Sequence, residues 1–489
     1  MAADAPPPVS TNPWRRLAFD RRTDRRLGRR LPPGPDDYSV ARTIRFVREP
    51  LPILLEAYHR YGPVFTVRVL HVRGVFLLGP AANHFVTVSH ADDFSWREGS
   101  LGDLVPLLGD GMLTIDGAYH RRARRIMLPM FHRERIAAMT GAMQAEAERA
   151  LAPWADGTRI DLYGWGRRLA LRIAMRALFG FDPDRALQDV DMAREFESAL
   201  AFYAQDYVLQ TLRGPGTPFH RLIAARRRLD GVIYAEIARR RASGERREDL
   251  LSLLLDARDE DGSAFSDREV RDQVMTMLFA GHDTATSTLT FLFYELSKQP
   301  AALGRLCAEQ DAVLGGRVPT AADLAGGLPE LDLALDETLR LYPPAWIGPR
   351  RAVRDTEFQG HELPAGTPVN YCSWASHHLP DVFPDPEAFV PARFSPENRA
   401  RLPKGAYVPF GGGSRTCLGM RFGQMEIKLI ATLILQRFRL ELAPAYELSV
   451  RQMPTLSPRG GMPMFVRPRG APDGLGGAVT AEPPAPATA

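Results

Sequence analysis

A glycine-rich loop that ends in a cysteine is the segment best suited to chemistry. Residues 410–419 read Phe-Gly-Gly-Gly-Ser-Arg-Thr-Cys-Leu-Gly, and Cys417 to Leu435 has apolar residues at helical spacing, so we predict that Cys417 lies in the first turn of a long helix. There the thiolate would be favoured by unpaired amide donors and the helix dipole. Such a thiolate can be a nucleophile or a metal ligand. A phosphate loop fits less well, because no Lys-Ser/Thr pair follows the glycines.

The spacing of five residues in this loop resembles the haem-binding loop of the cytochrome P-450 family: Phe410, Gly413, Arg415, Cys417 and Gly419. The resemblance implies that Cys417 is the axial thiolate ligand of a haem b (iron protoporphyrin IX). It also implies that Arg415 bonds a haem propionate and that Phe410 and Gly419 belong to the cofactor site. The alternative is a small buried cysteine beside a turn. The other two cysteines, Cys307 and Cys372, lack glycine-rich surroundings, and we expect both to be packing residues.

A second constellation lies inside a long helix predicted from Ser266 to about Leu296, which Ser266 and Glu269 begin with capping-box spacing. Residues 280–284 read Ala-Gly-His-Asp-Thr and interrupt its apolar run. A glycine here costs about 1 kcal/mol relative to alanine, which suggests that an opening is needed. A core helix with a patch of small residues is the plainer interpretation.

The same resemblance assigns roles to this helix, which would cross the distal face of the haem with Ala280 in the cofactor site. Thr284 would bond iron-bound dioxygen, and Asp283 would help to relay protons. The family usually has a second hydroxyl directly after the threonine, whereas Ala285 stands here. We expect His282 to be solvated or ion-paired and not a metal ligand.

Two further sets of residues match family patterns. Glu337 and Arg340 lie three apart on one helical face, and with Arg393 they resemble a buried Glu-Arg-Arg network with a structural role. His120 and Arg124 have the spacing of the helix that binds the haem propionates, and Arg350 matches a third propionate ligand, with Arg351 as the adjacent alternative.

Other histidines do not form a convincing metal site. His361-Glu362 begins like a metalloprotease helix, but Pro364 breaks it and Ala365 replaces the second histidine. His377 and His378 are adjacent and diverge on any regular element, so we expect both in a loop.

The elements that must position these residues are mainly helices. Val64–Val69 and Gly74–Leu78 predict a hairpin, and Thr356–Tyr371 predicts short strands and turns. Glu330–Leu341 is a further predicted helix. The fold class is mainly α with a small β-sheet region, and the resemblance implies the cytochrome P-450 fold in a single large domain over residues 31–468.

The two ends are predicted to be tails, a basic and proline-rich one over residues 1–30 and a disordered one over 469–489. Trp14 to Arg30 holds eight arginines against two aspartates and has a poor helical stripe. We expect a solvated arm there, with a membrane-surface contact or a partner patch as alternatives.

Composition sets the broad class. Of 489 residues, 45% are hydrophobic and 25% charged, which is enough for a large core. The net charge of +4 is dispersed, which argues against nucleic-acid binding. Three cysteines cannot make a disulfide framework, and no apolar run is long enough for a membrane span, so we expect a cytoplasmic monomer.

The resemblance implies a monooxygenase that inserts one oxygen atom from O2 into an apolar small molecule such as a fatty acid, terpenoid, steroid or polyketide. We expect the substrate to contact Leu101–Leu113, Phe202–Leu212, Met277, Ala280, Ala345–Ile347 and Pro454–Leu456. Electrons would come from a separate ferredoxin or flavodoxin with its reductase, docked at Arg421, Lys428 and Arg125. The alternatives are a peroxide-using or isomerising haem-thiolate enzyme and a non-catalytic haem sensor.

Overall fold

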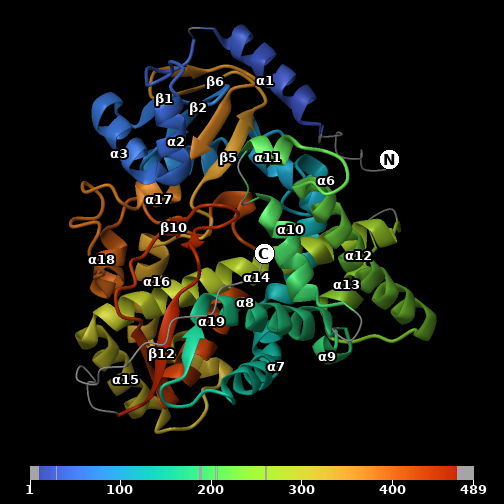
Figure 1. Cartoon of the computed structure of the whole chain (residues 1–489), viewed down its shortest axis with the longest axis vertical. Coiled ribbons are helices and arrows are strands. Elements are labelled where there is room, and N and C mark those ends of the chain that lie inside the picture. Colours follow the sequence, from blue (N-terminus) through green and yellow to red (C-terminus); the bar gives the residue numbers. More distant parts are fainter. Residues whose placement is uncertain are drawn as a thin grey trace.

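The computed structural model describes residues 10, 12–28, 30–186, 190–203, 205, 207–258 and 262–470, and most of them are helical (Figure 1). The helices of the first half are α1 (Pro13–Leu27), α2 (Val40–Arg48), α3 (Pro50–Tyr61), α4 (Pro80–His84), α5 (Val105–Leu108), α6 (Gly117–Met127), α7 (Arg133–Leu151), α8 (Leu162–Ile173), α9 (Pro183–Ala186), α10 (Met192–Tyr203), α11 (Tyr207–Thr211), α12 (Pro218–Ser243) and α13 (Leu250–Asp256). Those of the second half are α14 (Asp267–Lys298), α15 (Pro300–Leu314), α16 (Pro329–Leu341), α17 (Ser373–Ser376), α18 (Pro396–Arg401) and α19 (Met420–Arg437).

The strands are short. They are β1 (Val64–Val69), β2 (Val72–Leu77), β3 (Phe94–Ser95), β4 (Arg159–Asp161), β5 (Gly348–Ala352), β6 (Thr356–Phe358), β7 (His361–Leu363), β8 (Pro368–Tyr371), β9 (Phe438–Leu442), β10 (Val450–Arg451), β11 (Ser457–Pro458) and β12 (Pro463–Pro468). The largest sheet has the order β1-β2-β8-β5-β3, in which β2 and β8 are parallel and the other pairs antiparallel. A three-stranded sheet, β4-β12-β9, and two two-stranded sheets complete the set.

The expected elements around the motifs are present. The hairpin is β1 and β2, with Val64 opposite Leu77, and its second strand begins two residues earlier than predicted. The segment from Thr356 to Tyr371 contains β6, β7 and β8. The long helix is α14, and at its start the Ser266 hydroxyl accepts from the Glu269 N–H while the Glu269 carboxylate accepts from the Ser266 N–H, which is the predicted capping box.

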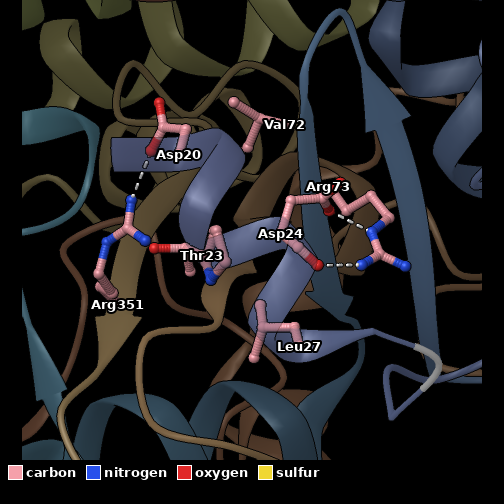
Figure 2. Close-up of a pocket in the computed structure, with 8 residues that line it drawn as sticks. Asp20, Thr23, Asp24, Leu27, Val72, Arg73 and Arg351 are labelled. Carbon is pink, nitrogen blue, oxygen red and sulfur yellow. Dashed lines mark hydrogen bonds and ion pairs between the residues drawn. The ribbon is translucent and has the colours of Figure 1, made fainter. Parts of the chain in front are cut away.

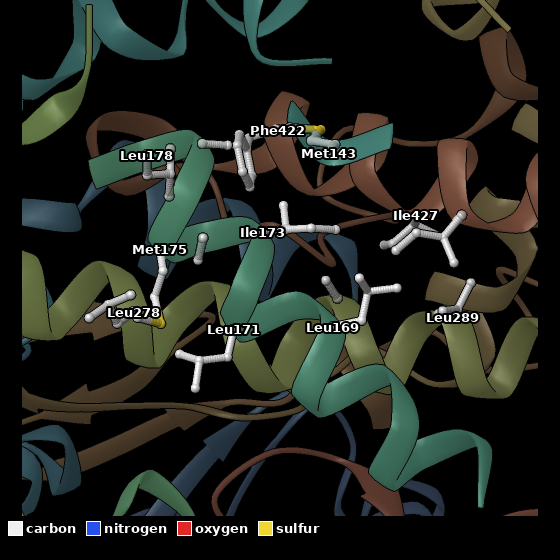
Figure 3. Close-up of a cluster of buried hydrophobic side chains, with 14 of the residues drawn as sticks. Met143, Leu169, Leu171, Ile173, Met175, Leu178, Leu278, Leu289, Phe422 and Ile427 are labelled. Atoms are coloured by element: carbon white, nitrogen blue, oxygen red, sulfur yellow. The ribbon is translucent and has the colours of Figure 1, made fainter. Parts of the chain in front are cut away.

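The main hydrophobic core lies where α7, α8, α14 and α19 pack together. Figure 3 shows α8 crossing α14, with Leu278 and Leu289 of α14 and Phe422 and Ile427 of α19 in the same cluster as Leu169 and Ile173. Helix α14 carries the Ala280–Thr284 motif, and α19 directly follows the cysteine loop. Packing in this core therefore holds both motifs in place. Separate, smaller clusters pack around the large sheet at the other end of the molecule.

The predicted solvated arm is wrong for most of its length, because residues 13–27 form helix α1, which packs on the large sheet. Asp20, Thr23 and Leu27 are buried. Asp20 accepts a hydrogen bond from Arg351, and Asp24 pairs with Arg73 (Figure 2). The helical stripe looked poor in the sequence because two of its inward positions are carboxylates, which find arginine partners on the sheet.

At the two ends of the chain, residues 1–9, 11 and 471–489 lie outside the described residues, and the last of these ranges is most of the predicted C-terminal tail. The boundaries of the predicted domain therefore stay predictions. In the part of the chain that the structure describes, no helix combines the length and apolarity needed to cross a bilayer.

Candidate functional site

The cysteine loop, residues 410–419, contains the 3-10 turn η8 (Gly413–Arg415) and leads into α19. Cys417 lies three residues before α19, so its predicted place in the first helical turn is wrong by less than one turn. The backbone N–H of Cys417 donates to the Phe410 carbonyl at 2.9 Å and closes the loop. Phe410 itself packs partly buried against the main core.

Gly413 is required by the geometry of this loop. Its φ is +60°, and a Cβ there would lie 2.3 Å from the carbonyl oxygen of Thr87, which belongs to the π-helical segment η1 (Phe85–Ser89). A side chain at this position would push the loop away from η1. The glycine thus fixes the approach of the cysteine loop to its neighbour.

Cys417 is exposed, although many protein atoms lie around its sulfur. This burial raises the pKa of the Cys417 thiol, while the N–H groups of Gly419 and Met420 and the positive charge of Arg124 act to lower it. A metal ion that coordinates this sulfur would displace the proton to solvent, because a coordinating thiol is deprotonated outright.

The other cysteines are placed differently. The Cys372 thiol is fully buried, lies 3.2 Å from the Trp346 carbonyl to which it donates, and has its pKa raised to about 12 by burial. Cys307 is half-buried in α15, and burial raises its pKa. The described residues contain no group of three or more His, Cys, Asp or Glu side chains arranged to hold a metal ion, and His377 and His378 lie in a turn after α17 as expected.

Four predicted cofactor residues form one basic cluster: His120 and Arg124 from α6, Arg350 from β5 and Arg415 from η8. Burial lowers the pKa of His120 to about 3, and the positive charges of Arg415 and Arg124 lower it further in the same direction. Burial, with Arg350 and Arg124 nearby, likewise lowers the pKa of Arg415 to about 10. Groups far apart in the sequence are thus close enough to repel one another.

Asp116, which the sequence analysis did not single out, is the counter-charge of this cluster. Its carboxylate accepts from Arg415 Nη2 at 2.7 Å and from the Ser95 hydroxyl at 2.6 Å. The Arg350 guanidinium stacks on the Trp96 ring, 3.7 Å from its centre. Nothing marks Asp116 in the sequence except that it precedes α6.

This cluster has the charge to hold a dianion. Three guanidiniums face one carboxylate and a neutral imidazole, and Arg124 forms no hydrogen bond or ion pair with any described residue. Two propionates would balance the excess. Together with the exposed Cys417 thiol, the donor set fits a haem.

Helix α14 borders open space at its Ala280–Thr284 motif. A Cβ built on Gly281 would have no heavy atom within 4 Å, and Ala280 and Thr284 are half-buried beside it. The Thr284 hydroxyl donates to the Ala280 carbonyl at 2.7 Å. Further along the helix the hydroxyls of Thr286, Thr288 and Thr290 each donate to the carbonyl four residues earlier.

Asp283 is buried on another side of α14, in a network that the sequence analysis missed. Its carboxylate accepts from the Tyr163 hydroxyl at 2.6 Å and from the Thr455 hydroxyl, and Arg167 Nε lies 3.3 Å away. Burial alone would raise the pKa of Asp283, but Arg167 and these hydrogen bonds hold it below its ordinary value. Asp283 is therefore an ionised carboxylate whose position is fixed by three partners.

His282 differs from expectation. It is fully buried, and its ring nitrogens have no hydrogen-bond partner among the described residues. Burial lowers its pKa to about 3, so the ring is neutral, and it packs 6.1 Å from the ring of Phe196. A solvated or ion-paired histidine is thus excluded.

The three predicted structural residues lie together. Glu337 accepts from Arg340 Nε at 2.9 Å and Nη2 at 2.8 Å, and from Arg393 Nε at 3.3 Å. Arg340 continues to the carbonyls of His377, Pro386 and Ala388.

His377 links this network to the cysteine loop, a role that the sequence analysis missed. Its Nδ1 lies 3.2 Å from the Arg340 carbonyl, and its Nε2 accepts from the Val408 N–H at 3.0 Å. The second bond makes Nε2 an acceptor and so assigns the proton to Nδ1.

The predicted substrate-contacting segments reach α14 from several elements. Residues 109–112 are tied to its first half, where the Met112 N–H donates to the Gln273 side chain at 3.0 Å, and a Cβ on Gly111 would lie 1.8 Å from Thr276 Oγ1. Ser287 donates to the Leu456 carbonyl. Parts of 202–212 lie outside the described residues, and that these segments share one pocket stays a prediction.

Comparison with known proteins places these features in a family context. The family model described as "Cytochrome P450" matches residues 32–460. "Cyclooctat-9-en-7-ol 5-monooxygenase" of Streptomyces melanosporofaciens is 37% identical over 373 residues, covering 74% of this chain and 79% of its own. "Cyclooctatin synthase" of the same organism is 36% identical and covers 74% and 80%.

Solved structures agree with the sequence comparison. The structure described as "Retinoic acid bound cyanobacterial CYP120A1" has a TM-score of 0.81 and 30% identity, and the match covers 90% of this chain and 99% of that one. The "cytochrome P450DA heme domain" has a TM-score of 0.81 and 27% identity, with 90% and 98% covered.

Proposed function

The chain belongs to the cytochrome P450 family and is a haem-thiolate monooxygenase, and from this premise we propose that it oxidises a largely hydrocarbon substrate of the terpenoid class. The observation that carries the reaction class is the cysteine loop, in which the exposed Cys417 sulfur receives the amide N–H groups of Gly419 and Met420. Two relatives support the substrate class. One is named as a cyclooctat-9-en-7-ol monooxygenase, and the other is solved with retinoic acid bound.

The residues proposed to hold the haem come from three parts of the chain. Cys417 would ligate the haem iron, and His120, Arg124, Arg350 and Arg415 would receive the two propionates. When bound, a haem with a thiolate ligand supplies the activation of dioxygen. Because Arg415 already pairs with Asp116, that carboxylate orients the guanidinium toward the cofactor site.

Thr284 and Asp283 handle protons on the opposite side. The Thr284 hydroxyl donates its hydrogen bond to the Ala280 carbonyl, so its oxygen lone pairs are left to accept a hydrogen bond from the open space. Asp283 is ionised and can take up a proton at its carboxylate oxygens. Tyr163 and Thr455, which donate to those oxygens, keep the carboxylate in place.

The redox partner is proposed to be a ferredoxin or flavodoxin served by its own reductase. Two exposed arginines, Arg121 and Arg125, border a recess of about 370 Å³ beside the cysteine loop. Its lining also includes the propionate candidates His120 and Arg124, with Leu128, Pro129, His132 and Ser414. Carboxylates of an acidic partner suit the two exposed arginines. Arg421 is exposed and stays in the proposed surface, but Lys428 is withdrawn from it, because Lys428 is buried and pairs with Asp332 at 2.7 Å.

We further propose that the protein acts as a monomer in the cytoplasm. Three free cysteines support a reducing compartment, and the molar mass of the purified protein in solution tests the monomer.

The experiment that tests the function has two stages. First, Cys417→His should abolish the thiolate-type spectrum of the reduced carbon-monoxide complex, whereas Cys372→Ser and Cys307→Ser should retain it. Loss of that spectrum in Cys372→Ser alone would reassign the ligand. Second, terpenoids, fatty acids and steroids are titrated against the oxidised protein, and the binders are tested for turnover with NAD(P)H, a ferredoxin and a reductase.

The second stage separates the proposal from its alternatives. Incorporation of one oxygen atom from labelled O2 into a terpenoid supports it. Turnover with hydrogen peroxide but not with O2 would instead favour the peroxide-using class. Tight binding of every ligand class without NAD(P)H consumption would favour a haem sensor.

A further inference from the structure

Helix α1 separates its charges between two sides. Its two carboxylates, Asp20 and Asp24, both face the large sheet (Figure 2). Asp20 accepts from Arg351 Nη2 at 3.2 Å, with His71 Nε2 3.3 Å away, and Asp24 pairs with Arg73 and, at 3.3 Å, with Arg68. The inward side of α1 is therefore electrically satisfied.

The outward side carries positive charge alone. Arg15, Arg21, Arg22 and Arg25 are exposed and form no hydrogen bond through their side chains, and no ion pair, with any described residue. No carboxylate lies on this side of the helix. The remaining two arginines of α1 are committed elsewhere, Arg16 to Asp103 and Arg26 to the Ala365 carbonyl.

Large apolar side chains stand among these charges. Trp14 is 69% exposed and Phe19 52% exposed. Trp14 is the single exposed tryptophan of the chain's six, since the others are buried or half-buried. Among the described residues, the exposed Trp14 indole has no aromatic or cation–π partner.

Helices α1 and α2 are linked beneath this surface by the buried Arg68. The Arg68 guanidinium reaches Asp24 of α1 and lies 4.2 Å from the centre of the Tyr38 ring, while its carbonyl accepts from Arg42 of α2. Figure 1 shows α1, α2 and the β1–β2 hairpin at the same end of the molecule.

Helix α2 adds an aliphatic stripe to this end. Val40, Ile44 and Val47 follow the spacing of one helical face and are 78%, 49% and 56% exposed, and Tyr38 just before them is 75% exposed. Leu70 at the tip of the hairpin is also exposed, and its N–H donates to Thr43 of α2 at 3.2 Å.

We propose that this end of the molecule, the α1–α2 face, binds the surface of an anionic lipid bilayer. A cluster of basic residues is attracted to anionic headgroups, and Trp, Phe and aliphatic side chains enter the boundary between headgroups and acyl chains. A nucleic acid would satisfy the arginines equally well but offers no apolar environment for Val40, Ile44 and Val47. A lipid surface accounts for both the exposed arginines and the exposed aliphatic side chains. No step of the oxygenation reaction enters this argument.

Vesicle binding tests whether the arginines of α1 are attracted to anionic headgroups. The haem-loaded protein is sedimented with phosphatidylcholine vesicles that contain or lack phosphatidylglycerol, at low and high salt. We expect binding only to the anionic vesicles and its loss at high salt. The triple variant Arg21→Glu, Arg22→Glu, Arg25→Glu should bind at least about tenfold more weakly.

A matched control separates the face from the net charge. Arg194→Glu, Arg227→Glu and Arg459→Glu change the same charge at exposed arginines elsewhere, and the combined variant should bind like the wild type. Unchanged haem spectra and thermal unfolding show that both variants are folded. Equal binding of all three proteins, equal loss in both variants, or no binding of the wild type would each overturn the proposal.

Fluorescence tests the apolar half. Brominated phosphatidylcholine in the anionic vesicles should quench the emission of Trp14, and Trp14→Phe should remove that quenching. Quenching that is the same in both proteins would contradict insertion at α1 and overturn the proposal. So would binding to duplex DNA that is tighter than binding to vesicles and lost in the α1 triple variant.

Discussion

The Tyr163 hydroxyl donates to the Asp283 carboxylate over 2.6 Å, joining α8 to α14 in the interior of the protein. The same hydroxyl accepts from Arg451 Nη2 at 3.2 Å, so three elements meet at one phenol. A carboxylate with this support stays ionised without solvent, because its charge is balanced by Arg167 and by fixed hydroxyl dipoles.

Removing that phenol should therefore shift the titration of Asp283. In Tyr163→Phe we expect the pKa of Asp283 to rise, so the acid limb of the pH–rate profile moves to higher pH, and the free energy of unfolding to fall by about 2 kcal/mol. Tyr446→Phe is the control, since its hydroxyl binds a carbonyl, Gly461, far from the motif. An unmoved pH profile in Tyr163→Phe would remove Tyr163 from the proton path.

Thr284→Ala should leave haem binding intact but divert electrons from product to peroxide, because the lone pairs that order a proton donor are lost. The observable is product formed per NAD(P)H consumed. Thr288→Ala deletes an equivalent back-bonded hydroxyl one turn further on and should keep the wild-type ratio. The same ratio in wild type and Thr284→Ala would show that the hydroxyl takes no part.

Glu337→Ala should destabilise the fold and lower haem occupancy, because two guanidiniums, Arg340 and Arg393, are left without their carboxylate. The expected cost is about 3 to 5 kcal/mol. Glu330→Ala, in the same helix, breaks an exposed pair with Arg305 and should cost less than about 1 kcal/mol. Thermal unfolding and haem content of the two variants are the measurements. A stable Glu337→Ala protein that is fully loaded with haem but turns over poorly would contradict the structural role.

Glu426 should make stability depend on pH. It is buried in α19, and burial raises its pKa to about 8 from the ordinary 4.5. Between these values the folded state binds more protons than the unfolded state, so stability is fully present below pH 4.5 and falls as the pH rises toward 8. The limiting slope is about 1.4 kcal/mol per pH unit.

The variant Glu426→Gln should lose this slope. Urea unfolding at about pH 5 and about pH 8 should give a smaller difference in the variant than in the wild type. Glu441→Gln, at an ion-paired and half-exposed position in β9, serves as the control. Parallel pH profiles for wild type and Glu426→Gln would show that Glu426 titrates normally.

The sequence predicted the parts of the site that are local in the chain. The cysteine loop and the Ala280–Thr284 motif each depend on a few adjacent residues, whose glycines and capping box are visible without a fold. Asp116, Tyr163 and Thr455 could not be found this way, because each is an ordinary residue that acquires a partner more than 100 positions away.

Helix α1 failed for a related reason. A carboxylate on one side of a helix argues against burial of that side unless a positively charged partner is known. Asp20 pairs with an arginine on β5, and Asp24 pairs with arginines on β2 and β1, and none of these pairs can be seen in the sequence. Cys417 was misplaced by three residues because helix boundaries depend on backbone hydrogen bonds that the apolar pattern does not mark.

The hydroxyls of Thr284, Thr286, Thr288 and Thr290 are all satisfied within α14 itself. These four hydroxyls need no polar partner from the elements that pack on the helix. Those elements can exchange side chains during evolution without leaving any of the four unpaired, so the walls beside these threonines are free to diversify. Directed evolution for new substrates should accordingly accumulate changes in the segments facing α14 sooner than in its threonines.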